Sequence, residues 1–461
     1  MRGHRNLSLT EGPLLQSIIK FSIPLMLSNV LQVLFNMSDI AVVGRFAGPE
    51  ALGAVGSTTI LVSLFTGFLI GMGSGVNVTV ARYLGARQDE DVSQTVHTSA
   101  IVLLLSGILL FLFGYIFTPD MLNLLGTKDV LLTGAIRYLR IYSFGMPALA
   151  VFNFGNGVLS ASGDTRRPLV FLSVSGALNV ILNLLFVIGF KMAEAGVALA
   201  SVISQYLSAV LIILSLLRRN ESIGLYPRKL SIDRRKCKQI LSISIPSGAQ
   251  NAIFAIANLF IQAGVNTFEP VIVEGNAAAA NADALVYDVM AAVYTACSSF
   301  MSQNYGSGQI ERVRKSYTLS LTLSFGIAAG MSTLLVVFGH TFLSLFTKSP
   351  SVVEAGMIRL RVMGYSYAFS AFMDCTIAAS RGLGKSLIPT LIVILGSCVF
   401  RIVWVFTVFE YYHTILSLYL LYIFSWTLTG VAEIVYFVYC YRKQISILSS
   451  KKYANDITSN K

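Results

Sequence analysis

The chain has 461 residues, of which 55% are hydrophobic and only 12% are charged, and its formal net charge is +12. A soluble globular domain carries about 25% charged residues, so this composition excludes two or three ordinary soluble domains. The mean hydropathy of +0.71 and the grouping of apolar residues into long runs instead indicate an integral membrane protein.

In chain order, about twelve apolar runs are long enough to cross a bilayer as helices, which takes about 20 residues each. Barrel strands would alternate in polarity over about ten residues, and these runs do not. The sequence therefore predicts an all-α integral membrane protein. The first six predicted spans are 17–43, 52–80, 95–118, 130–155, 167–190 and 195–217, and the second six are 239–267, 275–300, 315–346, 352–379, 386–410 and 414–441.

The basic residues are distributed unevenly between alternate loops. Most of the 34 Lys and Arg fall in the two terminal tails and in every second loop, whereas the other loops hold only Arg45, Lys128, Lys191 and Lys348. Because positively charged loops stay on the cytoplasmic side, both termini are expected in the cytoplasm of a multi-pass cell membrane protein. The charge is thereby explained by topology, and no nucleic-acid partner is expected.

The chain also repeats itself at an offset near 221 residues. The segment "IPLMLSNVLQVLFN" from Ile23 corresponds to "IPSGAQNAIFAIAN" from Ile245, and "YLGARQDEDV" corresponds to "NYGSGQIERV". Each half holds an even number of spans, so the two repeats are parallel, as in transporters with a substrate site between two halves. The predicted parts are an N-terminal lobe (1–217), a basic cytoplasmic linker (218–238), a C-terminal lobe (239–445) and a cytoplasmic tail (446–461). The alternative is that the duplication only builds a large helical body.

The first predicted span contains an acid in an apolar setting. Asp39 shares one helix face with Asn29, Gln32 and Asn36, because their spacing of three and four residues keeps them within a narrow arc. A polar stripe inside a membrane must face a cavity or another helix. A carboxylate removed from water favours its protonated form, so Asp39 can gain and lose a proton near neutral pH. The alternative is a permanently protonated Asp39 that hydrogen-bonds to neighbouring helices.

Further polar side chains in the predicted spans are candidates for the same cavity. The second repeat carries Asn251 and Asn258 in place of Asn29 and Asn36, but Ile261 in place of Asp39. The remaining candidates are Asn153, Asn156, Asn179, Asn183, Ser201, Asp283 and Asp374. Each can instead serve as a helix–helix hydrogen bond or as one half of an ion pair. Arg401 is a possible partner of one of the acids in the second half.

Two glycine patterns point to packing rather than to chemistry. Gly67, Gly71 and Gly75 are spaced by four residues, which allows close approach of a neighbouring helix. The segment "ASRGLGKS" lacks the first glycine of a phosphate-binding loop and follows a membrane helix instead of a strand. No catalytic or metal-binding pattern is present, so we expect no enzyme activity, no metal and no cofactor.

With these motifs in hand, the chain resembles the multidrug and toxic compound extrusion (MATE) family from about residue 13 to 445. The segments that carry the resemblance are "NMSDIAVVGRF", "VARYLGARQDEDV", "YLRIYSFGMP", "GVLSASGDTRRP", "ALNVILNLLFVIGF" and "SFMSQNYGSGQ". The resemblance implies a V-shaped bundle of twelve helices. It places a coupling ion, H⁺ or Na⁺, at Asp39, Asn179, Asn183 and Ser201. The family's second acid in the N-x-x-x-D pattern is Asn183 here.

The leading hypothesis is accordingly a secondary antiporter that exports lipophilic, often cationic organic compounds in exchange for H⁺ or Na⁺ by alternating access. The cavity candidates are Asn29, Gln32, Asn36, Asn153, Asn156, Asn251, Asn258, Asp283 and Asp374. A lipid-linked glycan flippase of related fold is the alternative within transport, and an ion channel or non-transporting membrane protein is the alternative of another class. The expected partners are a small organic molecule and the bilayer, and a monomer is expected.

Overall fold

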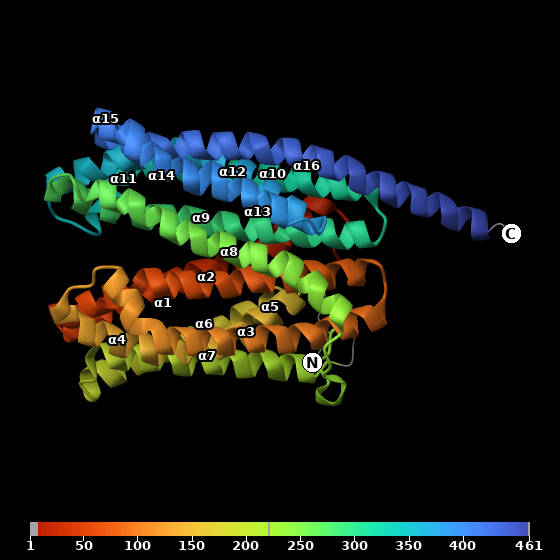
Figure 1. Cartoon of the computed structure of the whole chain (residues 1–461), viewed down its shortest axis with the longest axis horizontal. Coiled ribbons are helices and arrows are strands. Elements are labelled where there is room, and N and C mark those ends of the chain that lie inside the picture. The colour runs from red at the N-terminus through yellow and green to blue at the C-terminus, as the bar shows by residue number, and fades with distance from the viewer. Residues whose placement is uncertain (1–7, 220–221, 460–461) are drawn as a thin grey trace. The chain divides into compact units, whose positions relative to one another are not determined.

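The computed structural model describes residues 8–219 and 222–459, and these residues fold into helices joined by short turns (Figure 1). No strand occurs in this part of the chain, as the apolar pattern predicted. The first half contains α1 (Leu14–Phe46), α2 (Pro49–Gly85), α3 (Asp89–Leu124), α4 (Asp129–Ser143), α5 (Met146–Ala161), α6 (Arg166–Leu184), the π-helical segment η1 (Leu185–Gly189) and α7 (Ala193–Leu217).

The second half repeats this order after a short 3₁₀ turn, η2 (Pro227–Lys229). It contains α8 (Arg234–Val265), α9 (Pro270–Gly306), α10 (Ile310–Val337), α11 (Gly339–Ser344) and α12 (Pro350–Gly382). A nearly continuous helical stretch follows, made of α13 (Leu387–Val393), η3 (Ile394–Val399), α14 (Phe400–Trp404), η4 (Val405–Phe409) and α15 (Glu410–Tyr412), and α16 (Ile415–Ser459) closes the chain.

Within the described residues, ten helical segments are long and apolar enough to cross a membrane. They match ten of the twelve predicted spans. The predicted span 130–155 is instead two helices, α4 and α5, because the chain turns at Phe144 and Gly145. The predicted span 352–379 is a single 33-residue helix, α12, whose polar residues, including Arg359 and Asp374, reduce its apolar character.

The chain divides into two compact units whose limits cross the helices α1 and α8. Unit 1 contains residues 23–84 and 88–255, and unit 2 contains 8–22, 85–87 and 256–461. The beginning of α1 belongs to unit 2, where Asn304 Nδ2 donates a hydrogen bond to the Leu9 carbonyl (3.0 Å) and Phe21 packs edge-on against Phe300. The first two-thirds of α8 belong to unit 1, because this part of α8 packs against α2.

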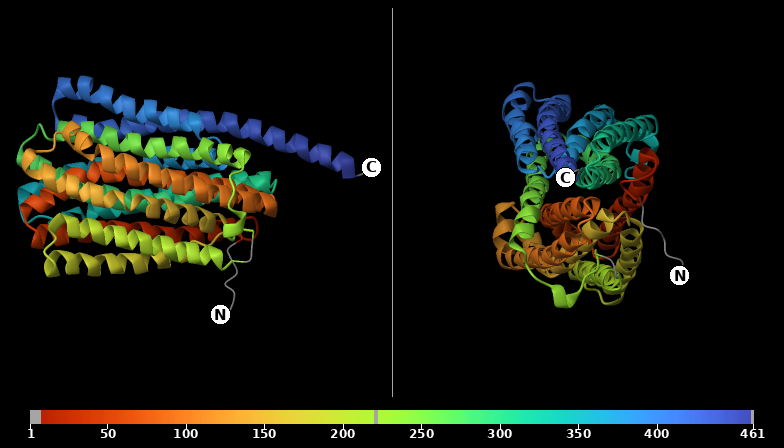
Figure 2. Two further views of the ribbon diagram at one scale, coloured as in Figure 1. Left: turned by 60° about the horizontal axis from the view of Figure 1, so that its bottom comes forward. Right: turned by 90° about the vertical axis from the view of Figure 1, so that its right-hand side faces the viewer.

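Helices extend into the predicted linker and into the predicted tail. The predicted linker 218–238 is shorter, because α8 already begins at Arg234, where the Asp233 carboxylate accepts a hydrogen bond from the Lys236 backbone N–H (2.8 Å) and so caps the helix. The apolar part of α16 ends at Ile447, and α16 continues as one helix through the predicted tail to Ser459, past the other helices of unit 2 (Figure 2).

The glycine pattern of α2 is a packing device, as predicted. A Cβ atom added to Gly71 would lie 2.4 Å from the Gly248 backbone nitrogen, and one added to Gly75 would lie 2.1 Å from Ser244 Oγ. The same face allows Asn251 Nδ2 to donate a hydrogen bond to the Gly67 carbonyl (2.9 Å). The glycines therefore let α2 and the first part of α8 approach closely inside unit 1.

Candidate functional site

The acid in the first helix lies on the predicted polar stripe of α1. The helix runs without interruption through all four residues of the stripe, although Pro24 lies inside it. Asn29 and Asp39 are half-buried, whereas Gln32 and Asn36 are exposed. The stripe is thus the open face of α1, and Asp39 lies where this face meets the other helices of unit 1.

Three polar side chains from α6 and α7 converge on Asp39. Asn183 Nδ2 donates a hydrogen bond to Asp39 Oδ1, and Ser201 Oγ donates to Asp39 Oδ2 at 3.3 Å. Asn179 links the two donors, because its Nδ2 donates to Ser201 Oγ (3.4 Å) and its Oδ1 accepts from Asn183 Nδ2 (3.2 Å). The structure therefore brings the four predicted coupling-ion residues into one hydrogen-bonded cluster.

The local fold explains this convergence. Asn179 and Asn183 are four residues apart on α6, so both side chains face the same direction. Helix α7 follows α6 after the short η1 segment and packs against it, which places Ser201 opposite the two asparagines. Asn179, Asn183 and Ser201 are all buried, so their polar groups depend on one another and on Asp39 for hydrogen bonds.

Sequence analysis missed two tyrosines near this cluster. Tyr138 and Tyr142 lie on α4, their rings are stacked with centroids 5.9 Å apart, and both phenols interact electrostatically with Asp39. The two residues are four apart, so a pair of tyrosines on one face of a predicted membrane helix was the available signal.

The other polar candidates of unit 1 make separate contacts. Asn153 Nδ2 donates to the Leu149 carbonyl of its own helix (2.9 Å), and Asn156 Oδ1 accepts from Ser160 Oγ (3.4 Å). Asn251 is bonded to α2, as described above, and Asn258, which belongs to unit 2, is exposed. These contacts do not connect to the Asp39 cluster, and the role of these residues in a cavity stays a prediction.

Unit 2 contains a different polar centre around Asp283. Arg359 forms a buried ion pair with Asp283, donating from both Nε (3.2 Å to Oδ2) and Nη2. Tyr367 also donates to Asp283, and Arg359 Nη1 donates to Asn276 Oδ1 (2.6 Å). The guanidinium lies 5.3 Å from the centre of the Tyr419 ring. Asp283 is therefore satisfied by partners from α12, not by Arg401.

Arg401 is associated with the other predicted acid of unit 2. The Arg401 guanidinium is buried, donates from Nε to Ser425 Oγ (3.1 Å) and lies 4.7 Å from the centre of the Tyr422 ring. It interacts electrostatically with Asp374, which is also buried. Asp374 interacts first with Arg381 and then with Arg401, and both Asp374 and Arg401 are buried apart from the Asp283 centre.

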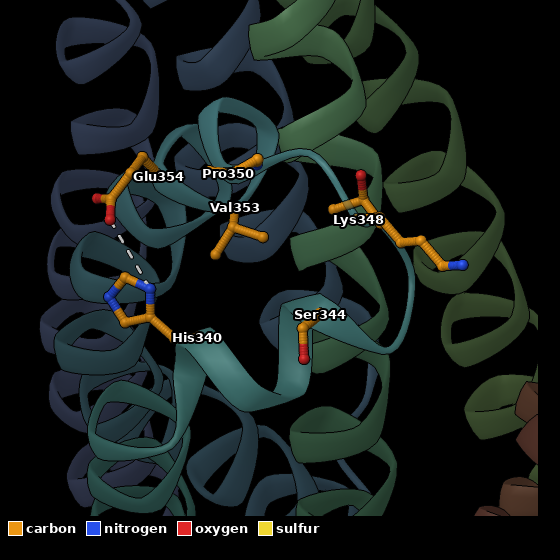
Figure 3. A pocket seen from close by; sticks show the side chains of 7 residues that line it. His340, Ser344, Lys348, Pro350, Val353 and Glu354 are labelled. Carbon is orange, nitrogen blue, oxygen red and sulfur yellow. Dashed lines mark ion pairs between the residues drawn. The ribbon is translucent and has the colours of Figure 1, made fainter.

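A surface hollow of about 400 Å³ is present where α11 meets α12 (Figure 3). His340 of α11 faces Glu354 of α12 across it, with 3.7 Å between His340 Nδ1 and Glu354 Oε1. Both side chains are exposed, and Lys348 extends away from the pair. The hollow lies in unit 2, contains no residue of the predicted site and has no polar group that is both buried and directed into it.

The described helices and the internal repeat define a polytopic membrane protein of duplicated architecture. A model of the MatE family matches the chain twice, over residues 24–185 and 246–407, one match in each repeat. The chain therefore belongs to the MatE family of multidrug efflux transporters, and the sequence resemblance and the two-repeat fold are confirmed.

Similar proteins from bacteria align with most of the chain. "Probable multidrug resistance protein YoeA" of Bacillus subtilis is 28% identical over 389 residues, which are 82% of this chain and 83% of that protein. "Probable multidrug resistance protein NorM" of Thermotoga maritima is 26% identical over 86% of each chain, and an "FAD transporter" of Shewanella oneidensis is 23% identical over 75% of this chain and 77% of its own. These relatives are membrane transporters, which indicates that this chain also lies in a cell membrane.

Solved structures share the fold at lower identity. A structure described as the outward-facing conformation of a multidrug resistance MATE family transporter has a TM-score of 0.88 and 22% identity, covering 98% of this chain and all of that chain. A transporter from Pyrococcus furiosus, described as having a binding pocket of reversed polarity, has a TM-score of 0.89 and 22% identity over 97% of this chain. At this identity the likeness supports the fold alone.

Proposed function

We propose that this protein is a secondary active antiporter that exports lipophilic, often cationic organic compounds in exchange for H⁺ or Na⁺ by alternating access. Membership of the MatE family supports drug efflux as the general activity. The names of the Bacillus and Thermotoga relatives support multidrug substrates, whereas the Shewanella relative is named for FAD. The exposed stripe on α1 offers amides and one acid, and it has no Lys or Arg until Arg45, which suits a cation better than a pyrophosphate.

The Asp39 cluster is the single observation that carries the ion-coupling part of this proposal. An ionised carboxylate in a largely apolar unit needs donors, and Asn183 and Ser201 supply one to each oxygen. A protonated carboxyl group needs an acceptor for its own O–H. An amide can present its oxygen instead of its NH₂ by rotating about its last bond, so Asn183 can serve both states of Asp39.

The same cluster can serve either coupling ion. The side-chain oxygens of Asp39, Asn179, Asn183 and Ser201 are hard ligands of the kind that small hard cations prefer. A proton needs only the Asp39 carboxyl group and one acceptor. In a protein with alternating access, antiport then follows if binding of the ion at Asp39 and binding of the drug are mutually exclusive, because the ion displaces the drug on one side of the membrane and the drug displaces the ion on the other.

The orientation proposed from the loop charges places the linker and both termini in the cytoplasm. A reporter fused after Lys461 that is active only in the cytoplasm tests this directly. Activity of such a reporter supports the proposal, and activity of a periplasmic or extracellular reporter at the same position contradicts it. The proposed monomer is tested by the mass of the purified protein in detergent.

Transport in proteoliposomes tests the proposed antiport. Efflux of a fluorescent lipophilic cation should be driven by an imposed pH gradient or Na⁺ gradient, and Asp39→Asn should abolish it. Asp120→Asn is the matched control, because Asp120 is an exposed acid at the end of α3. Ion flux without dye movement would instead favour a channel, and equal efflux by wild type and Asp39→Asn would remove Asp39 from the mechanism.

A further inference from the structure

The chain between the two repeats is anchored to unit 1 instead of forming a free connection. We call residues 222–233 the docked linker. Its side chains Ile223 and Leu225 are buried in the apolar core of unit 1, together with Val92 and Val96 of α3. The Leu225 backbone N–H donates a hydrogen bond to the Leu216 carbonyl at the end of α7 (3.2 Å). The docked linker therefore moves with unit 1 as long as these contacts persist.

A buried histidine of α3 forms the central polar contact of the docked linker. His97 is 1% exposed, and its ring stacks on Tyr226 with 6.2 Å between ring centroids and 20° between ring planes. His97 Nδ1 lies 2.6 Å from the Ser93 carbonyl oxygen, and His97 Nε2 accepts a hydrogen bond from the Tyr226 backbone N–H at 3.0 Å. One imidazole thus joins α3 to the linker backbone.

These two bonds fix the protonation state of the ring. A carbonyl oxygen only accepts, so Nδ1 must carry a hydrogen, and a backbone N–H only donates, so Nε2 must be bare. The neutral Nδ1–H imidazole is the only form that makes both bonds. Adding a proton to Nε2 would direct its N–H toward the N–H of Tyr226, break the hydrogen bond and leave a charge in a buried site.

Among the residues that the structure describes, Asp91 of α3, Asp233 of the docked linker and Asp164, which contacts the chain just after α7, already have other partners. On the side of α3, Asp91 forms an ion pair with Lys236 of α8, and near the end of α7 Arg219 forms an ion pair with Asp164. On the linker and at the start of α8, the charged groups are Lys229, whose Nζ lies 5.3 Å from the Tyr226 ring centre, and Asp233, which caps α8. The contacts of His97 itself are with Ser93 and Tyr226, and neither residue carries a charge that could compensate an imidazolium.

We propose that His97 is a proton-operated latch, which holds the docked linker on unit 1 while neutral and releases it when protonated. Release frees the segment that joins the two repeats, and in the orientation proposed above this segment faces the cytoplasm. The latch is a property of the linker and does not depend on the role of Asp39 or on the identity of the transported compound. Protonation of His97 Nε2 removes the acceptor of the Tyr226 N–H, so a fall in cytoplasmic pH is the trigger of release.

Hydrogen exchange of the purified full-length protein tests the latch. Peptides that cover residues 222–230 are followed at pH 7.5 and pH 5.5, and rates are corrected for the intrinsic pH dependence of exchange. We expect the protection of the wild type to fall about tenfold at pH 5.5, because protonation of Nε2 removes the acceptor that holds the Tyr226 backbone N–H. In His97→Gln, whose side-chain oxygen can accept from Tyr226 but carries no titratable group, protection should be the same at both values.

Two further variants keep the test decisive. His340→Gln removes an exposed histidine of unit 2 and should keep the full response of the wild type. If His97→Gln does not fold, His97→Asn replaces it as a second neutral acceptor. The latch is contradicted if the wild type shows equal protection at both pH values, or if a folded neutral variant at position 97 loses protection at pH 5.5 as the wild type does.

Discussion

Asn183 Nδ2 donates a hydrogen bond to Asp39 Oδ1 and so joins α6 to α1 across 144 residues of sequence. Asn183 is the position at which the family resemblance implies a second acid. One carboxylate and one amide therefore occupy the place of two carboxylates. Asp39 is therefore the only acid among the four residues of the cluster. The Asp39–Asn183 pair can hold a single negative charge, and the Asn183 amide supplies a donor beside it.

Restoring the second acid and removing the donor should have opposite effects. Two adjacent carboxylates do not both ionise readily, so Asn183→Asp should share one proton and keep at least half of the wild-type efflux. Asn183→Leu leaves Asp39 without this donor, and efflux should fall at least about tenfold, because a hydrogen bond to a charged group contributes about 1.5–3 kcal/mol. Dye efflux from proteoliposomes measures both. Full activity of Asn183→Leu would show that the contact has no role in transport.

The hydroxyl of Ser201 should tune the proton affinity of Asp39. Ser201→Ala removes one of the two donors to the ionised Asp39 carboxylate, so the pH of half-maximal efflux should differ from that of the wild type. Ser204→Ala is the matched control, since Ser204 is buried on the same helix but donates only to the Ala200 carbonyl (2.8 Å). The pH profile of efflux is the measurement. An identical shift in both variants would mean that loss of any α7 hydroxyl has this effect.

The glycines of α2 should be required for stability. In Gly71→Ala the new Cβ would lie 2.4 Å from a backbone nitrogen of α8, so the helices must separate, at a cost of about 1–3 kcal/mol. Gly56→Ala on the same helix meets no atom within 4 Å and should not lower the melting temperature. Thermal unfolding in detergent, monitored by size-exclusion chromatography, compares the melting temperatures of the two variants. Equal melting temperatures would contradict the close packing of α2 and α8.

The buried ion pair of unit 2 should be sensitive to loss of one partner. Asp283→Asn leaves the Arg359 guanidinium buried without its counter-ion, which should destabilise the fold by about 3–5 kcal/mol. Glu311→Gln breaks an exposed ion pair with Lys315 and serves as the control, with no measurable change expected. Thermal unfolding again provides the readout. Stability of Asp283→Asn equal to that of the control would show that Arg359 is satisfied without Asp283.

The sequence predicted the features that depend on local periodicity. Apolar runs identified the membrane helices, and three- and four-residue spacing identified the stripe on α1 and the shared face of Asn179 and Asn183. The division of span 130–155 into two helices was not predicted, although Pro147 marks a point at which this span can bend. The Asp283–Arg359 pair was also not predicted, since its members are 76 residues apart and no periodicity connects α9 to α12.

The contacts of Asp39 with residues of α6 and α7 could not be predicted from helical spacing alone. Helical spacing placed each residue on a face of its own helix, but which faces meet is decided by packing between helices. Only the resemblance to a family supplied that grouping. His97 gave no signal at all, because a lone histidine at the end of an apolar helix looks the same whether or not a linker docks on it.

Exchange of an ion for substrate at Asp39 is the central claim, and ion release on substrate addition measures it most directly. A lipophilic cation is added to the purified protein in weakly buffered detergent solution, with a pH indicator to detect H⁺ and a parallel sample loaded with ²²Na⁺. Wild type should release about one H⁺ or one Na⁺ for each substrate bound, and Asp39→Asn should bind substrate without releasing either ion. Substrate binding by the wild type with no ion release, or equal release by Asp39→Asn, would contradict the account.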